Sequence, residues 1–124
     1  MVFHSPNKKE PNIDFPVLNI NGIILEKTNE FNFLGTTISN TLSWKTHCSN
    51  LCKQLSRTIG TLKRLQNTVP TFTLLTIYNS LFQSYMSHSI LVWGHQPGRI
   101  FKLQKRAVRI ISKAKYNAHT NKLF

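Results

Sequence analysis

The sequence predicts an α+β fold in which short antiparallel strands over residues 1–42 precede a bundle of three helices over residues 43–124. Before residue 43, apolar residues alternate with polar ones around two turn signals, which is the pattern of short strands. After it, apolar residues recur every three or four positions, which is the pattern of amphipathic helices. A chain of 124 residues can bury roughly two-thirds of its unfolded surface, which is enough for a core.

The strand region contains two hairpin signals. Asn21 and Gly22 follow one another between β-forming residues, and this dipeptide favours the two-residue turn of a hairpin. In "FNFLGTTISNTLSW", Phe31 and Phe33 fall on alternate positions, and Gly35 supplies the second turn. We therefore expect a tight hairpin turned at Gly35, directly before the first helix.

The first helix is expected to begin at Ser43, because a serine side chain can accept a hydrogen bond from the amide groups of a first turn. Its apolar face recurs at helical spacing and consists of Trp44, Cys48, Leu51, Leu55, Ile59 and Leu62. Lys53, Arg57 and Arg64 lie on a different face. These three cations are predicted to contact a polyanion.

The second helix is expected to run from Thr71, its predicted cap, to the break at "GHQPG" (residues 94–98). Its broad apolar face consists of Leu74, Leu75, Tyr78, Leu81, Phe82 and Tyr85. Residues 65–98 contain no Asp, Glu, Lys or Arg, but polar side chains interrupt them throughout. The stretch is therefore predicted to be a buried helix and not a membrane span.

The third helix is "RIFKLQKRAVRIISKA", residues 99–114. One side is apolar and consists of Ile100, Leu103, Ala107, Ile110 and Ala114. The other side carries five cations along about three turns: Lys102, Lys105, Arg106, Arg109 and Lys113. The three helices are predicted to pack through Trp44, Leu51, Leu55, Tyr78, Leu81, Leu103 and Ile110.

The charge distribution points to a polyanionic partner. The net charge is +12, from 16 Lys and Arg against 4 Asp and Glu, and all four acids lie within the first 30 residues. Exposed helices usually mix charges of both signs, because each pair at i, i+4 gains about 0.2–0.5 kcal/mol. The acid-free helices forgo this gain, which favours a nucleic acid, or less strongly a lipid surface. The alternative is a solvated basic face without a partner.

The residues that catalysis or metal binding would require are missing from the pattern. Magnesium-dependent phosphoryl transfer needs clustered carboxylates, and the four acids are scattered, so no catalytic or metal-binding residue is assigned. A zinc site at His47, Cys48 and Cys52 would lack a fourth ligand at a sensible spacing. A disulfide between the two cysteines, four apart on one helix, would be strained, so free thiols in a reducing compartment are expected.

Three blocks of the sequence resemble the end of a reverse transcriptase of the jockey type, encoded by retrotransposons without long terminal repeats. These blocks are "FNFLGTTISNTLSWKTH", "LFQSYMSHSILVWG" and "LQKRAVRIISKAKYNAHTNKLF". The opening "MVFHSPNKK" is similar to the palm strand that follows the catalytic aspartates in that family. The resemblance implies that Phe33, Leu34 and Gly35 form the primer-grip hairpin. It also implies that the helices from Trp44 onward form a thumb-like region holding an RNA/DNA template–primer.

The resemblance further implies that the chain is a fragment of an RNA-directed DNA polymerase. The catalytic Tyr-x-Asp-Asp-type motif and its magnesium would then belong to the parent's fingers and palm, so this chain alone is expected to be inactive. By analogy with the parent element, it would be intracellular and nuclear. One rival is a stand-alone basic nucleic-acid-binding protein. The other is a membrane-surface helix at 99–114, anchored by Phe101, Ile110 and Ile111.

Overall fold

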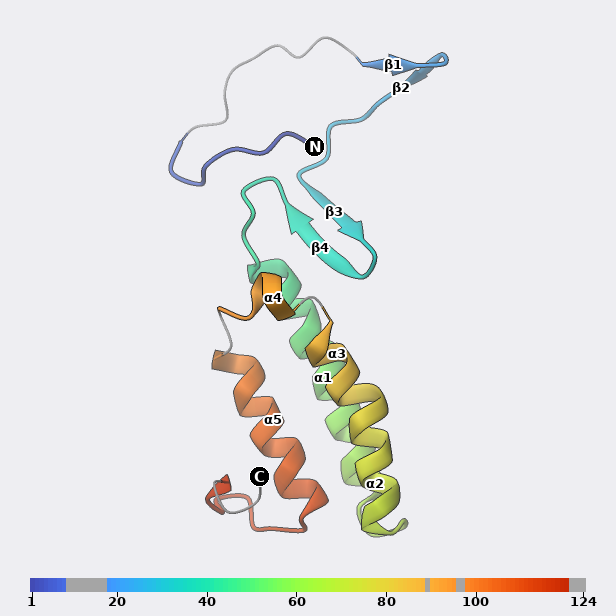
Figure 1. The fold of residues 1–124 in the computed structure, drawn as a ribbon, viewed down its shortest axis with the longest axis vertical. Helices are drawn as coiled ribbons and strands as arrows, with labels where there is room; N and C mark the ends of the chain where they lie inside the picture. The colour runs from blue at the N-terminus through green and yellow to red at the C-terminus, as the bar shows by residue number, and fades with distance from the viewer. Residues whose placement is uncertain (9–17, 89, 96–97, 121–124) are drawn as a thin grey trace. The chain divides into compact units, whose positions relative to one another are not determined.

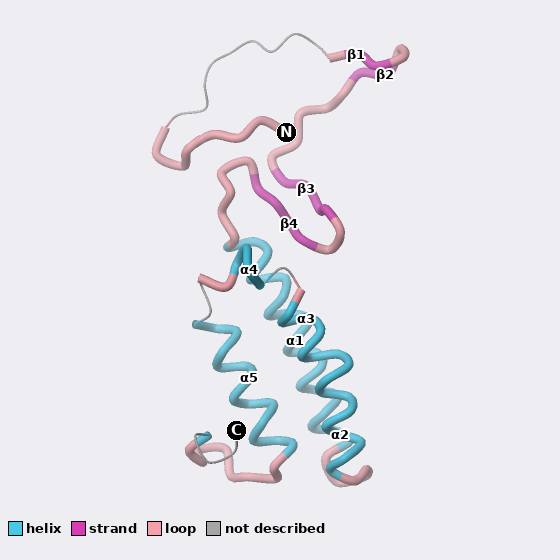
Figure 2. Tube along the Cα trace, in the orientation of Figure 1, coloured by secondary structure: helices cyan, strands magenta, loops and turns pink. Residues whose placement is uncertain are grey.

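The structure is a computed structural model that describes residues 1–8, 18–88, 90–95 and 98–120. It confirms the predicted α+β fold: two short antiparallel strand pairs are followed by three helical stretches (Figures 1 and 2). The chain divides into two compact units, Met1–His47 and Cys48–Phe124. The part of the predicted strand region at residues 9–17 lies outside the described residues.

The first hairpin pairs β1 (Asn19–Ile20) with β2 (Ile23–Ile24). Asn21 and Gly22 form its turn with φ angles of 51° and 81°. Two successive left-handed residues make a type I′ turn, whose twist matches that of the strands. The Leu25 amide donates to the carbonyl of Leu18 at 2.9 Å and extends the ladder by one bond. The hairpin predicted from Asn21 and Gly22 is therefore confirmed.

The second hairpin pairs β3 (Glu30–Phe33) with β4 (Thr36–Ser39), in a register that sets Phe33 opposite Thr36. Its turn consists of Leu34 and Gly35, with φ angles of 47° and 82°. The predicted turn at Gly35 is thus confirmed. Leucine at a left-handed position is uncommon, because its Cβ crowds the backbone there.

The first unit ends inside the first helix, five residues beyond the predicted boundary at residue 42. Two contacts attach this helical turn to the second hairpin. The Thr46 hydroxyl donates to Glu30 Oε1 at 2.8 Å, and the Thr37 amide donates to His47 Nδ1 at 3.3 Å. These two hydrogen bonds join the first turn of α1 to the second hairpin, and the change of periodicity in the sequence did not reveal them.

The first helix, α1 (Lys45–Leu65), begins two residues after the predicted cap Ser43. The prediction of Ser43 as the N-cap is wrong, because α1 begins only at Lys45 and the backbone of Ser43 bonds to the Ser39 side chain instead. The Ser43 amide donates to Ser39 Oγ at 2.9 Å, and that hydroxyl lies 3.1 Å from the Ser43 carbonyl. The predicted apolar face of α1 is largely buried, through Leu51, Leu55, Ile59 and Leu62.

The second helical stretch is subdivided into α2 (Thr71–Ile77), the π-helix η1 (Tyr78–Gln83), α3 (Ser84–Ser87) and α4 (Ile90–Trp93). Pro70 occupies the N-cap position with extended backbone, so the prediction of Thr71 as the cap is wrong by one residue. A break at His88, whose ψ is 121°, separates α3 from α4. The sequence did not predict this break. The Trp93 indole N–H donates to the His88 carbonyl at 2.9 Å and so links α4 to the residue at the break.

The core of the second unit draws on all three helical stretches. Its buried apolar residues are Leu51, Leu55, Ile59, Leu62, Leu74, Phe82, Trp93, Ile100, Ala107, Ile110 and Ile111. Leu81, predicted to be in the core, is 43% exposed, whereas its neighbour Phe82 is fully buried. Trp44, Tyr78 and Leu103 are half-buried.

The π-helix η1 explains why Phe82 is fully buried while Leu81, its neighbour, is partly exposed. At about 100° per residue, two α-helical positions eight apart differ by about 80° in direction. The wider turn of η1 rotates each residue less, so Leu74 and Phe82 come to face nearly the same side. Both side chains are fully buried, and the Phe82 ring stacks on Tyr78 with centroids 5.1 Å apart.

The third helix, α5 (Gly98–Ile111), ends three residues before the predicted limit. The Lys113 amide donates to Ile110 O at 3.1 Å, and the Ala114 amide donates to Arg109 O at 3.0 Å. Lys113 has a φ of 51°, which completes a Schellman motif. Lys113 therefore lies beyond the helix, and the prediction that it continues the cationic face of α5 is wrong.

Candidate nucleic-acid interface

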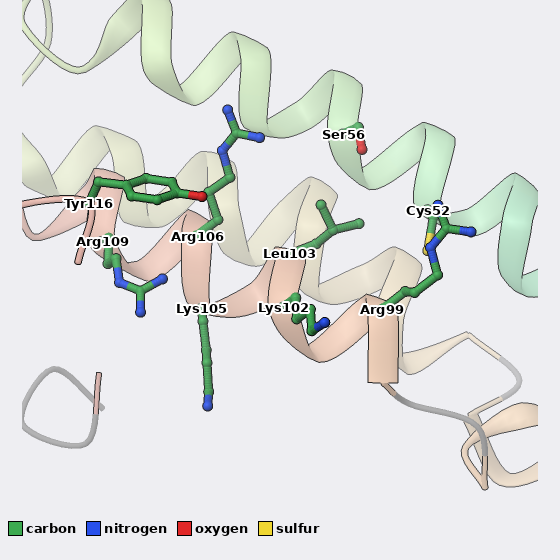
Figure 3. A pocket seen from close by; sticks show the side chains of 9 residues that line it. All are labelled: Cys52, Ser56, Arg99, Lys102, Leu103, Lys105, Arg106, Arg109 and Tyr116. Carbon is green, nitrogen blue, oxygen red and sulfur yellow. The ribbon is translucent and has the colours of Figure 1, made fainter. Parts of the chain in front are cut away.

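A cleft of about 530 Å³ lies between α1 and α5, within the second unit (Figure 3). The α1 side contributes Cys52 and Ser56. The remaining lining residues are Arg99, Lys102, Leu103, Lys105, Arg106, Arg109 and Tyr116. Five of the nine lining residues are cations, so the cleft is a strongly basic surface.

A smaller cavity of about 170 Å³ continues the cleft toward the end of α5. It shares Arg106, Arg109 and Tyr116 with the first cavity, and it adds Lys63 from α1. We call the two together the α1–α5 cleft. It presents six lysine and arginine side chains in all.

The helical period explains why the cations gather at this cleft. Ile100, Ala107 and Ile110 turn into the core, so the residues beside that stripe come to lie at its edge. Arg99 and Arg106 are seven residues apart, which on an α-helix is about 10 Å along one face. Figure 3 shows both side chains directed toward α1, while Lys105 points away from it. Lys105 Nζ lies 4.4 Å from the centre of the Phe101 ring in a cation–π contact.

No acidic side chain lines the cleft, and the second unit contains none, because the sequence from residue 31 onward has no Asp or Glu. Like charges at neighbouring positions repel one another and lower stability. An anion that enters the cleft relieves this repulsion. Arginine guanidinium groups match the geometry of phosphate oxygens in a bidentate way.

The thiol groups of Cys48 and Cys52, both on α1, have pKa values raised by burial. Both cysteines are free. Burial raises the pKa of Cys52 above the ordinary 9.0, and nearby Arg99 partly opposes that rise. Burial also raises the pKa of Cys48, and the proximity of Cys52 raises it further. The thiols are therefore protonated at neutral pH and are poor nucleophiles.

The structure brings together some of the predicted contact residues and leaves others outside. Lys102, Lys105, Arg106 and Arg109 all line the α1–α5 cleft. Lys53, Arg57 and Arg64 are exposed and do not line it, and neither does Lys113.

Among the charged and aromatic residues of the cleft, sequence reasoning missed three, namely Lys63, Arg99 and Tyr116. A signal for Arg99 was present, since it lies three residues before Lys102 and extends the same stripe by one turn. Lys63 and Tyr116 enter the cleft only through tertiary packing, so the sequence pattern alone did not single them out.

The predicted grip residues lie at the tip of the second hairpin, in the first unit. Phe33 is 56% exposed and Leu34 is 78% exposed. Both belong to the end of the hairpin where the chain turns with positive φ at Leu34 and Gly35. The tip thus presents apolar side chains on a short, defined turn.

Among the described residues, no group of three or more His, Cys, Asp or Glu side chains is placed to hold a metal ion. Within the same part of the chain, no helix has both the length and the apolar character needed to cross a membrane.

Comparison of the chain with protein-family models, with curated proteins and with solved structures finds no match.

Proposed function

We propose that the chain binds nucleic acid through the α1–α5 cleft, as the thumb-like region of a retrotransposon reverse transcriptase that holds an RNA/DNA template–primer. The observation that carries the proposal is the row of cations along the cleft in a unit that has no acidic side chain. Lysine and arginine bind a phosphate backbone by releasing its counterions, whatever the base sequence. The resemblance of three sequence blocks to the jockey-type polymerases indicates which nucleic acid this is, namely an RNA/DNA template–primer.

The tip of the second hairpin supports the grip role as a separate surface. Leu34 holds a left-handed conformation with a φ of 47° and is 78% exposed. Non-glycine residues held in a left-handed conformation cluster at functional sites. We propose that Phe33, Leu34 and Gly35 contact the end of a primer strand in the parent polymerase.

Exposed apolar side chains on the second helical stretch support a role as part of a larger protein. Phe72 is 77% exposed, Leu75 45% and Tyr85 39%. Phe72 and Leu75 lie three residues apart, about one helical turn, and exposed apolar patches commonly mark a site of contact with another protein. We propose that the parent's fingers and palm are the partner, that they carry the catalytic carboxylates and magnesium, and that the whole acts in the nucleus. This chain alone would then not extend a primer.

A stand-alone basic nucleic-acid-binding protein is the second candidate, since the α1–α5 cleft serves either role. The two differ in the behaviour of the isolated chain. A stand-alone protein would be monodisperse in size-exclusion chromatography, whereas a polymerase part would self-associate through the exposed apolar residues of α2 and α3.

The proposal is tested by anisotropy titration of a labelled RNA–DNA hybrid, a DNA duplex and anionic vesicles with the purified chain. We expect the hybrid to bind at least as well as DNA, because a cationic cleft recognises backbone shape and charge. Binding to vesicles without binding to either duplex would contradict the proposal and favour a membrane-surface role for residues 99–114.

The grip role of the second hairpin has its own test. Replacing Leu34 by Asn should relieve the backbone strain yet weaken binding to a recessed primer end.

A further inference from the structure

One aromatic residue in the α1–α5 cleft is not explained by phosphate binding. Tyr116 is 83% exposed, although it lines both parts of the cleft beside Arg106 and Arg109. A tyrosine normally buries much of its large apolar ring. A ring left in solvent within a row of arginines instead offers a flat face to a ligand (Figure 3).

Hydrogen bonds fix the turn that carries Tyr116. The Ala118 amide donates to the Lys115 carbonyl at 2.9 Å, which closes a turn around Tyr116. Arg109 Nε donates to the Ala118 carbonyl, also at 2.9 Å, and this bond ties the turn to α5. The Schellman motif at Lys113 sets the direction in which the chain leaves the helix. Three local constraints therefore fix the backbone that carries the ring at the end of the cleft.

We propose that the α1–α5 cleft also takes the single-stranded template that extends beyond the duplex, and that an unpaired base of this strand stacks on the ring of Tyr116. This inference rests on the proposed function and names the form of nucleic acid at that site. Cationic grooves with exposed aromatic rings bind single strands, because every base has a face that can stack. In an intact duplex the bases already stack on one another, so their faces are not accessible to a side chain.

The dimensions of the cleft suit a short strand. Arg99 and Arg109 are ten residues apart, or about 15 Å along the helix. At the rise of a duplex strand this length spans about four nucleotides. An unstacked single strand is more extended, so fewer of its phosphates fit, and Tyr116 lies at the Arg109 end. The cations then hold the backbone of the strand, and the tyrosine holds one base near its end.

The test compares two fluorescein-labelled oligomers of equal length, oligothymidine and the same oligomer with abasic sites. Both carry the same phosphates, so only the bases differ. The unmodified chain should bind oligothymidine roughly 5- to 150-fold more tightly, because stacking on an aromatic residue is worth about 1–3 kcal/mol per base. Tyr116→Leu should lose most of this preference and keep its affinity for the abasic oligomer. Tyr116→Phe should retain the preference, since it keeps the ring.

Phe72→Leu is the matched control, because Phe72 is a 77% exposed aromatic of α2 that does not line the cleft. It should leave the preference unchanged. Circular dichroism checks that each variant is folded. If the chain binds both oligomers but Tyr116→Leu retains the preference for bases, the stacking inference is overturned and the proposed function stands. If the chain binds neither oligomer nor any duplex, the proposed function fails, and the stacking inference fails with it.

Discussion

Arg109 Nε donates a hydrogen bond of 2.9 Å to the carbonyl oxygen of Ala118. This bond gives Arg109 two roles, since it lines the α1–α5 cleft and also anchors the turn that carries Tyr116. A residue with both roles cannot serve as a simple test of charge, because its removal also releases the turn.

Arg109→Lys should separate these two roles. Lysine keeps the positive charge but has no donor at the Nε position. We expect the free energy of unfolding to fall by about 0.5–1.5 kcal/mol, which is the usual value of one hydrogen bond. Urea denaturation measures this change. Arg106→Lys, at an exposed position of the same cleft, should change stability by less than about 0.5 kcal/mol. Equal losses for the two variants would show that the bond to Ala118 does not stabilise the fold.

Lys113→Gly should stabilise the protein. Lys113 has a φ of 51°, and glycine adopts that conformation without a steric penalty. The expected gain is about 0.5–1 kcal/mol in the free energy of unfolding. The control is Ser112→Gly, at a neighbouring residue outside the left-handed region, which should be neutral or destabilising. Because Lys113 does not line the cleft, a weaker affinity for nucleic acid in Lys113→Gly would contradict the assigned site.

Phe82→Ala should destabilise the protein far more than Leu81→Ala. Phe82 is fully buried against Tyr78, while Leu81 is 43% exposed. Truncating a buried phenylalanine costs about 3–5 kcal/mol, and a half-exposed leucine should cost roughly 1 kcal/mol or less. Thermal unfolding followed by circular dichroism distinguishes the two. The reverse order would mean that the π-helix is not present and that regular α-helical spacing places Leu81 in the core.

The thiols should react slowly with iodoacetamide at neutral pH and reach half-maximal rate only above pH 9.0, because burial raises the pKa of both. Arg99→Gln should raise the pKa of Cys52 further, since Arg99 opposes the effect of burial. Cys52→Ser should lower the pKa of Cys48 by removing a neighbouring thiolate. Mass spectrometry identifies which thiol is alkylated.

The raised thiol pKa values also determine how stability depends on pH. The folded state favours the protonated thiols, so their contribution to stability is complete below the unfolded pKa, near 9. It is lost as the pH rises from there through the folded pKa, because the unfolded thiols ionise first. The comparison is with the double variant Cys48→Ser, Cys52→Ser, which lacks both thiols. Stability of the unmodified chain that rises relative to this variant above pH 9.0 would contradict this direction.

The sequence predicted the fold where local patterns decide it. Asn21-Gly22 gave the first hairpin, and Gly35 located the second turn, because left-handed turn positions have strong residue preferences. The apolar stripe of α1 was also correct, since Leu51 to Leu62 keep a regular helical period. The sequence failed where tertiary contacts or irregular backbone decide. The π-helix turned Leu81 out of the core, and the break at His88 divided a helix that was expected to be continuous.

The candidate site was predicted in part for the same reason. Lys102 and Arg106 follow from the helical period of α5, and both line the α1–α5 cleft. Lys63 and Tyr116 join them from other segments of the chain, so no local pattern indicates them. Lys53 and Arg57 fall on one helical face, yet that face is exposed and does not line the cleft.

The central claim is that the α1–α5 cleft, and not positive charge in general, binds the phosphate backbone. Two double variants with equal net charge test it: Lys102→Gln with Arg106→Gln in the cleft, and Lys53→Gln with Arg57→Gln on the exposed face of α1. The measurement is the dependence of affinity for an RNA–DNA hybrid on salt, for the unmodified chain and both variants. With four to five phosphate contacts, log affinity should fall with log salt at a slope of about −4 for the unmodified chain. The cleft variant should flatten the slope by about two units, whereas the α1 variant should leave it unchanged. Equal flattening in both variants, or an unchanged slope in a folded cleft variant, would contradict the claim.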